Sequence, residues 1–274
     1  MVASRTPSCP VICGDEKPPE TRPSADRMPP IWIDCDARIG SARDSGRLAS
    51  KERSSVWLST PTWPNHPQVF GAAGLPIRAY PYLGADGELD IDTLLGVLKG
   101  VPAGDVVLLH TCCHNPTGID PTAEQWERIA DTITEAGALP LLDFAYQGFA
   151  DGLSEDARGL RALLARGITM FVASSLSKNI ALYDERVGAL SIVGADAYET
   201  ATLLSHAKAT IRSNYSNPPA HGGEIVATVL ADPALTEQWV GEVATMRDRI
   251  NGNRARFVEG LRAAGASGSH EALL

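Results

Sequence analysis

From Val56 onward, short and almost uninterrupted apolar runs alternate with amphipathic stretches, and this alternation limits the possible folds most strongly. Runs without a polar face are typical of strands that helices cover on both sides. Five runs predict strands, at Ile77–Tyr80, Asp105–Thr111, Leu139–Asp143, Thr169–Ser174 and Val187–Val193. Amphipathic stretches predict helices at Asp90–Lys99, Thr122–Ala136, Ala197–Ile211, Pro219–Leu230 and Pro233–Ala264. The pattern therefore predicts an α/β fold, a three-layer α/β/α sandwich around a mainly parallel sheet.

The chain changes character near residue 55. Residues 1–55 hold seven of the 19 prolines, and no segment there keeps an apolar period for two helical turns. We expect a disordered segment at 1–55 that does not fit the pattern of the rest of the chain. A large ligand-binding domain is expected at 56–232. At 233–274 we expect an interdomain helix with the start of a truncated small domain. In the long helix at 122–136, Thr122 and Gln125 predict a capping box, and Gly137 predicts the end of the helix.

Composition excludes several classes of partner. With 24 lysines and arginines against 33 acidic residues, the formal charge of −9 argues against binding to nucleic acid phosphates. No apolar stretch reaches the ~18–20 residues that span a bilayer, so we expect no membrane association. Five cysteines without disulfide-framework spacing predict reduced thiols and a cytoplasmic location. Neither a G-x-G-x-x-G fingerprint nor a Walker loop occurs, so ATP and NAD are not implied.

Unusual polar residues follow three of the predicted strands. They lie in the segments 112–118, 143–146 and 174–179, and they include Asn115, Asp143, Tyr146 and Lys178. Ligands of such sheets bind beyond the carboxyl ends of the strands, so we expect these side chains to converge. A carboxamide, a carboxylate, a phenol and an amine suit a cofactor that carries an aldehyde, a phenolic oxygen and a pyridine nitrogen, which describes pyridoxal phosphate. No metal ion is expected.

Residues 56 to about 264 resemble the class I aspartate/aromatic amino acid aminotransferases, which are fold-type-I pyridoxal-phosphate enzymes. Five ordered motifs carry the resemblance: Thr60-Pro-Thr-Trp-Pro-Asn-His66, His110-Thr-Cys-Cys-His-Asn-Pro-Thr-Gly118, Asp143-Phe-Ala-Tyr-Gln-Gly-Phe149, Ser174-Ser-Leu-Ser-Lys-Asn179 with Tyr183-Asp-Glu-Arg-Val-Gly188, and Ile211-Arg-Ser-Asn-Tyr-Ser-Asn-Pro-Pro-Ala-His-Gly222. The resemblance implies transfer of an amino group between an acidic or aromatic amino acid and a 2-oxo acid.

The resemblance also implies roles for the catalytic residues. Lys178 is similar to the lysine that bonds covalently to the cofactor and later moves the substrate proton; a primary amine with a lowered pKa suits both tasks. Asp143 is similar to the aspartate that keeps the pyridine nitrogen protonated. Asn115 and Tyr146 resemble the pair that hydrogen-bonds the phenolic oxygen. The alternative readings are a surface lysine, a turn-capping aspartate, a turn asparagine and a core tyrosine.

Further residues match cofactor and substrate contacts of the family. Trp63 resembles the aromatic that packs on the cofactor ring, and His66 and His110 resemble groups behind Asp143, although tryptophans and histidines beside strands are commonly core residues. The phosphate contacts match Ser175, Ser177 and Arg186. The substrate contacts match Asn115, Trp63, Arg212 and Ser216. Arg212 and Ser216 are similar to residues that reach into the neighbouring subunit's site, which implies a homodimer with shared active sites.

The chain departs from the family pattern at both ends. No match is found for the glycine-containing turn that holds the phosphate through backbone amides, or for the arginine that clamps the substrate α-carboxylate. The abrupt change at residue 55 and the last ten residues look like misassigned coding sequence joined to a genuine frame. A truncated, catalytically impaired relic of an aminotransferase therefore remains the alternative, and a lyase or decarboxylase of the same fold type is a weaker one. Preference between aspartate and aromatic substrates stays open.

Overall fold

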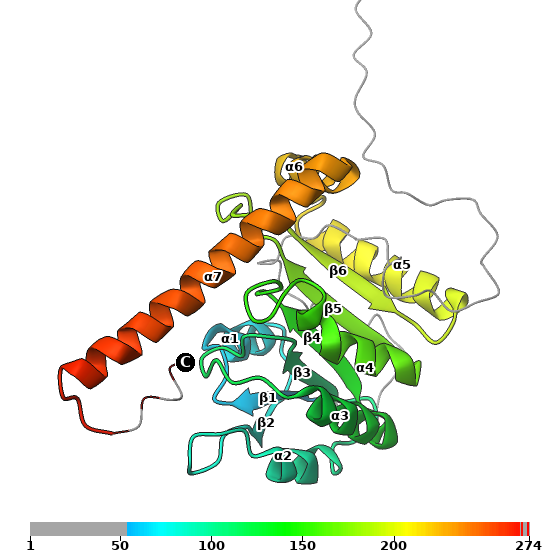
Figure 1. Ribbon diagram of the computed structural model, residues 1–274. Coiled ribbons are helices and arrows are strands. Elements are labelled where there is room, and N and C mark those ends of the chain that lie inside the picture. Colours follow the sequence, from blue (N-terminus) through cyan, green and yellow to red (C-terminus); the bar gives the residue numbers. More distant parts are fainter. Residues whose placement is uncertain (1–53, 269, 271–272, 274) are drawn as a thin grey trace, which may run out of the picture.

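A six-stranded sheet forms the centre of the molecule in the computed structural model, which describes residues 54–268, 270 and 273 (Figure 1). The strand order is β2-β1-β3-β4-β5-β6. Strands β1 to β5 pair in parallel, whereas β6 runs antiparallel to β5. The strands are β1 (Val56–Thr60), β2 (Ile77–Pro81), β3 (Val106–His110), β4 (Leu139–Phe144), β5 (Met170–Ser175) and β6 (Gly188–Val193). The predicted mainly parallel sheet is confirmed. Nearly all of the segment 1–55 lies outside the described residues.

All five predicted helices are present, together with two α-helices that the sequence did not indicate. The helices are α1 (Asn65–Ala72), α2 (Ile91–Leu98), α3 (Ala123–Ala136), the 3-10 turn η2 (Glu155–Ala157), α4 (Arg158–Arg166), α5 (Ala197–Asn214), α6 (Ala220–Ala231) and α7 (Pro233–Ala263). The additional helices are α1 and α4. Helix α1 contains Pro67 and Gly71 and has no side-chain cap, so its sequence carries little local helix signal. Strand β1 was also not among the predicted strands.

Two apolar clusters cover the two faces of the sheet. On one face, Val107 and Leu109 of β3 pack in a cluster with side chains of α2, α3 and α4. On the other face, Leu108 packs with Leu58 of β1 and Phe70 of α1. Consecutive residues of β3 thus serve opposite layers, as the alternation of side chains along a strand requires. Helices on both faces confirm the three-layer α/β/α arrangement.

Helix α3 shows how local sequence signals set the ends of an element. The Gln125 backbone N–H donates to Thr122 Oγ1 at 3.2 Å, and the Thr122 N–H donates back to Gln125 Oε1 at 2.8 Å. At the other end, Gly137 adopts a φ of 65°, which a residue without Cβ accepts at little cost. Both the predicted capping box and the predicted stop are confirmed.

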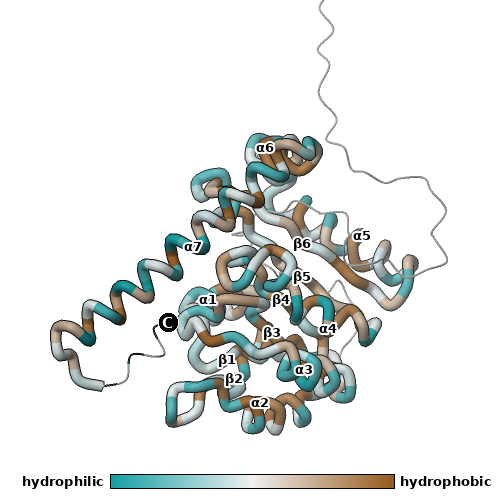
Figure 2. Tube along the Cα trace, in the orientation of Figure 1, coloured by the Kyte–Doolittle hydropathy of each residue, from teal (hydrophilic) through white to brown (hydrophobic). Residues whose placement is uncertain are grey.

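The longest helix, α7, runs along the side of the domain and away from α6 (Figure 1). Its hydropathy is mixed along the whole length, as Figure 2 shows. Val243 and Val258 are buried, while Val240, Ile250 and Phe257 are exposed. None of the helices in the described part of the chain combines the length and the apolar character needed to cross a membrane.

Candidate active site

The carboxyl ends of β3, β4 and β5 bring the three polar segments to one edge of the sheet. In the strand register, His110 pairs with Asp143, Asp143 with Ala173, and Phe144 with Ser174. Because these strands are parallel, the segments that follow them leave from the same edge. The convergence expected from the sequence is therefore a consequence of the observed register.

Asp143 lies between two histidines at this edge. His66 Nε2 is 3.1 Å from Asp143 Oδ2, and the other ring nitrogen of His66 is 2.8 Å from Thr62 Oγ1. His110 Nε2 lies 3.9 Å from the same carboxylate oxygen, and neither ring nitrogen of His110 has a hydrogen-bond partner among the described residues. Trp63 packs edge-on against His66, with 5.2 Å between ring centroids.

Electrostatics keep Asp143 ionised and His110 neutral. Burial acts to raise the pKa of Asp143, but the hydrogen bond from His66 and the electrostatic effect of the nearby His110, His66 and Lys178 side chains outweigh it, so the pKa is lowered. Burial, opposed by the charge of Asp143 and aided by His66, lowers the pKa of His110 to about 4. The site therefore presents a stable anion near neutral pH.

Lys178 and Tyr146 face each other across the same edge. Lys178 Nζ lies 4.4 Å from the centroid of the Tyr146 ring and 5.9 Å from that of Tyr183, within cation–π range of both. Asn115 Nδ2 donates to the Tyr146 hydroxyl at 3.3 Å. The pKa of Tyr146 is raised, first by burial and then by the charge of Asp143. The phenol therefore stays protonated and can donate a hydrogen bond.

The predicted phosphate contacts lie next to Lys178 in the chain. The Ser177 backbone N–H donates to Ser175 Oγ at 3.3 Å, while the buried Ser177 Oγ has no hydrogen-bond partner in the part of the chain that the structure describes. Arg186 has a positive φ of 49° and donates to the Tyr183 carbonyl at 3.2 Å. Ser175 and Ser177 thus lie three residues and one residue before Lys178 in the chain, and Arg186 lies eight residues after it.

Arg212 and Ser216 lie elsewhere, at the exposed end of α5. The Arg212 guanidinium donates to the Ser216 hydroxyl. Within the described residues, no hydrogen bond or ion pair joins these two residues to Asp143 or Lys178. A contact with a second subunit stays a prediction for both.

The sequence motifs indicate no role for the side chains that hold the Asn115 loop. His114 is buried, stacks on Tyr82 with 3.8 Å between ring centroids, and lies 2.9 Å from both Ser59 Oγ and Thr117 Oγ1. Asp120 accepts the backbone N–H groups of Cys113 at 2.6 Å and of His114 at 2.8 Å. In the sequence, His114 and Asp120 flank the segment Asn115-Pro-Thr-Gly118, which was the only available signal. Their function of fixing this loop becomes visible only in the packing of the folded chain.

Two other features mark the limits of the site. His66, His110 and Asp143 offer metal-ligand atoms within 4.8 Å of one another, a donor set that zinc accepts, although the 3.1 Å His66–Asp143 separation is that of a hydrogen bond.

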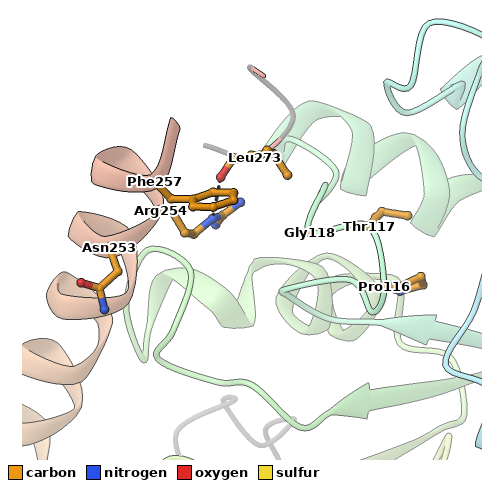
Figure 3. A pocket seen from close by; sticks show the side chains of 7 residues that line it. All are labelled: Pro116, Thr117, Gly118, Asn253, Arg254, Phe257 and Leu273. Carbon is orange, nitrogen blue, oxygen red and sulfur yellow. Dashed lines mark hydrogen bonds between the residues drawn. The ribbon is translucent and has the colours of Figure 1, made fainter. Parts of the chain in front are cut away.

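A separate hollow of about 430 Å³ lies between α7 and the segment 116–118 (Figure 3). Arg254 in its wall donates to the Leu273 carbonyl at 3.0 Å. None of the predicted site residues lines this hollow.

The fold and the site geometry agree with one protein class. The model of the family "Aminotransferase class I and II" matches residues 40–270, and the chain belongs to this family. The resemblance drawn from the motifs is thereby confirmed.

Individual relatives are aspartate and aromatic aminotransferases. The chain is 52% identical over 231 residues to the aspartate aminotransferase of Escherichia coli, covering 83% of this chain and 58% of the relative. It is 48% identical over 206 residues to the aromatic-amino-acid aminotransferase of Pseudomonas aeruginosa, covering 75% of this chain and 52% of the relative. The chain thus spans about half the length of these curated relatives.

Solved structures show the same fold. The aromatic-amino-acid aminotransferase of Burkholderia pseudomallei, covalently bound to pyridoxal phosphate, superposes with a TM-score of 0.78 at 44% identity, covering 81% of this chain and 56% of that chain. The broad specificity aminotransferase of Leishmania mexicana gives a TM-score of 0.78 at 37% identity, with coverages of 81% and 56%.

Proposed function

We propose that this chain forms the pyridoxal-phosphate-binding part of an aminotransferase that exchanges amino groups between an amino acid and a 2-oxo acid. The observation that carries the proposal is the meeting of the Lys178 amine, the Tyr146 phenol and the ionised Asp143 carboxylate at one sheet edge. The relatives named aspartate and aromatic aminotransferases support aspartate, glutamate or an aromatic amino acid as the substrate.

The residues present fit the cofactor. The buried Ser177 hydroxyl lacks a partner within the described range and can donate to a phosphate oxygen, and the ionised Asp143 can pair with a protonated pyridine nitrogen. Lys178 would hold the cofactor covalently through Nζ. The remaining proposed contacts are Asn115 and Tyr146 to the phenolic oxygen, Trp63 on the ring face, His66 and His110 behind Asp143, and Ser175 and Arg186 to the phosphate.

The chain's own residues then divide the work of transamination. When bound, the cofactor supplies an electron-withdrawing ring that accepts the electron pair left on the substrate Cα. Asp143 holds a proton on the pyridine nitrogen, and His66, itself bonded to Thr62, orients the carboxylate. Lys178, once displaced by the substrate amine, would take the proton from Cα and deliver it to the cofactor's C4′, on the other side of the shared nitrogen. Tyr146 donates a hydrogen bond and keeps this amine within reach of its ring.

The decisive experiment is covalent trapping. The purified chain mixed with pyridoxal phosphate should turn yellow, lose the colour on borohydride reduction, and carry the label on the peptide containing Ser177 and Lys178. Lys178→Ala should abolish the label. Lys208→Ala, at an exposed lysine on α5, is the matched control and should leave it unchanged. Labelling at Lys208, or none at saturating cofactor, would remove the basis of the proposal and favour the impaired relic.

A homodimer with shared sites is part of the proposal. Arg212, with its planar pair of donors, would bind the distal carboxylate of a dicarboxylic substrate in the neighbour's site, beside Ser216 of the same chain. Asn115 and Trp63 would contact the substrate from the chain that holds the cofactor. Mixed dimers of Lys178→Ala and Arg212→Ala chains should regain one working site, because each chain supplies what the other lacks. Activity no higher than in the two parent variants would refute a shared site.

We also place the reaction in the cytoplasm. A rice relative named cytoplasmic aspartate aminotransferase, 44% identical over 234 residues, supports this location. Fractionation of cells with an antibody to the chain tests it, and recovery in the membrane or extracellular fraction would contradict it.

A further inference from the structure

Asn179, the residue after Lys178, links the segment that carries the Lys178 amine to the segment that carries the Tyr146 ring. Its side chain is buried, with 2% of its surface exposed. Asn179 Nδ2 donates to the carbonyl of Gln147 at 3.3 Å, and Gln147 directly follows Tyr146. One carboxamide thus joins the neighbour of Lys178 to the neighbour of Tyr146.

Helix α7 holds the same two segments from outside. The indole of Trp239 donates to the Asn179 carbonyl at 2.8 Å across 60 residues of sequence. Four residues further along α7, Val243 packs so closely on Gly148 that a Cβ at position 148 would lie 2.5 Å from its Cγ1. Residues four apart share a helix face. A single turn of α7 therefore contacts both the Lys178 segment and the Tyr146 segment.

We propose that Asn179 and Trp239 are positioning residues that set the Lys178 amine over the Tyr146 ring, and that the orientation of α7 controls this distance. The proposal rests on the proposed function, because it assigns the two residues to the proton-transferring lysine. Lys178 is half-buried and its 4.4 Å approach to Tyr146 is a weak contact, so the backbone on either side must hold it. A movement of α7 would pass to the lysine through the Trp239–Asn179 hydrogen bond.

The first test uses the full chain before any cofactor is added. Brief acetylation with acetic anhydride, followed by peptide mass spectrometry, gives the labelling rate of Lys178 relative to the exposed Lys99 and Lys208. Trp239→Phe keeps a ring but removes the indole donor. Loss of one hydrogen bond of ordinary strength should free the segment and raise the relative labelling of Lys178 about fivefold. Gln238→Ala, on the same helix and bonded only locally to Glu242, is the control and should change nothing.

The second test keeps the inference separate from the function. In the cofactor-loaded chain, Trp239→Phe should shift the pH midpoint of the cofactor absorbance, while Gln238→Ala should not. Asn179→Ala should act more strongly in both assays, but Trp239→Phe decides the matter if Asn179→Ala does not fold. Unchanged Lys178 labelling in Trp239→Phe, or an equal rise at all three lysines, overturns the positioning role. Failure of the wild-type chain to take up cofactor overturns the proposed function. In that case the acetylation experiment, which needs no cofactor, still tests the positioning role.

Discussion

Substitution of Gly148 tests the packing of α7 on the loop that follows Tyr146. Gly148 has a φ of +97°, which side chains rarely adopt, and an added Cβ would lie 2.5 Å from Val243 Cγ1 and 3.0 Å from Leu153 Cδ2. Overpacking of this kind costs ~1–3 kcal/mol, and the strained backbone adds a further ~1–3 kcal/mol. We therefore expect Gly148→Ala to lower the free energy of unfolding by about 2–6 kcal/mol.

Urea unfolding, followed by circular dichroism, measures this loss. With a denaturant slope of ~2.5 kcal/mol per molar, the midpoint should fall by about 0.8–2.4 M without a change of slope. The matched control is Gly223→Ala in α6, where an added Cβ meets nothing within 4 Å. This control should gain up to ~1 kcal/mol, because alanine is the better helix former.

A double-mutant cycle separates the two causes. Val243→Ala removes the clashing methyl, so Gly148→Ala should cost less in the Val243→Ala background, by ~1 kcal/mol or more. The remainder is then the backbone strain at position 148 together with the contact with Leu153. A Gly148→Ala midpoint within roughly 0.2 M of wild type, or a coupling energy of zero, would refute the close contact between α7 and this loop.

The other predictions concern Asp143 and His110. Asp143→Asn should leave cofactor binding intact but slow half-transamination by about 10²–10⁴-fold, equivalent to ~3–5 kcal/mol. The reason is that an unprotonated pyridine ring is a poor electron acceptor. Single-turnover absorbance kinetics measure this rate, and a near-normal rate would make Asp143 merely structural. The folded-state pKa of His110 is depressed to about 4, so its contribution to stability is present above the unfolded value of ~6.5 and is lost as the pH falls toward 4. Unfolding titrations should show a loss of roughly 3 kcal/mol across this window, less in His110→Asn, and an identical pH dependence in the two proteins would contradict the buried neutral histidine.

Sequence alone predicted most of the regular structure because its signals are local. Continuous apolar runs indicated β3, β4 and β5, and the Thr122–Gln125 pair with Gly137 indicated both ends of α3. Where the local signal is weak, prediction failed. Helix α1 has no capping side chain and contains Pro67, and it is stabilised by packing of Phe70 on the sheet.

Sequence motifs also indicated the candidate site residues, but not the geometry that joins them. Asp143 and His66 are 77 positions apart in the chain. Their 3.1 Å hydrogen bond forms because α1, which follows β1, packs on the sheet face that β3 and β4 share with it. The clamp of His114 and Asp120 on the Asn115 loop likewise depends on stacking and burial. A motif gives the residue type at a position. The distance between two side chains in the folded chain depends on how all the helices and strands between them pack.

The sequence by itself determined the alternation of strands and helices, the polar segments at the strand ends, and the membership of an aminotransferase family. The tertiary structure decided which of those segments meet, because only strand order and register bring residues 110, 143 and 174 to one edge. It also decided that α7 packs on the Lys178 and Tyr146 segments through Trp239 and Val243. No local pattern encodes such a contact, since its stability comes from burying surfaces that lie far apart in the chain.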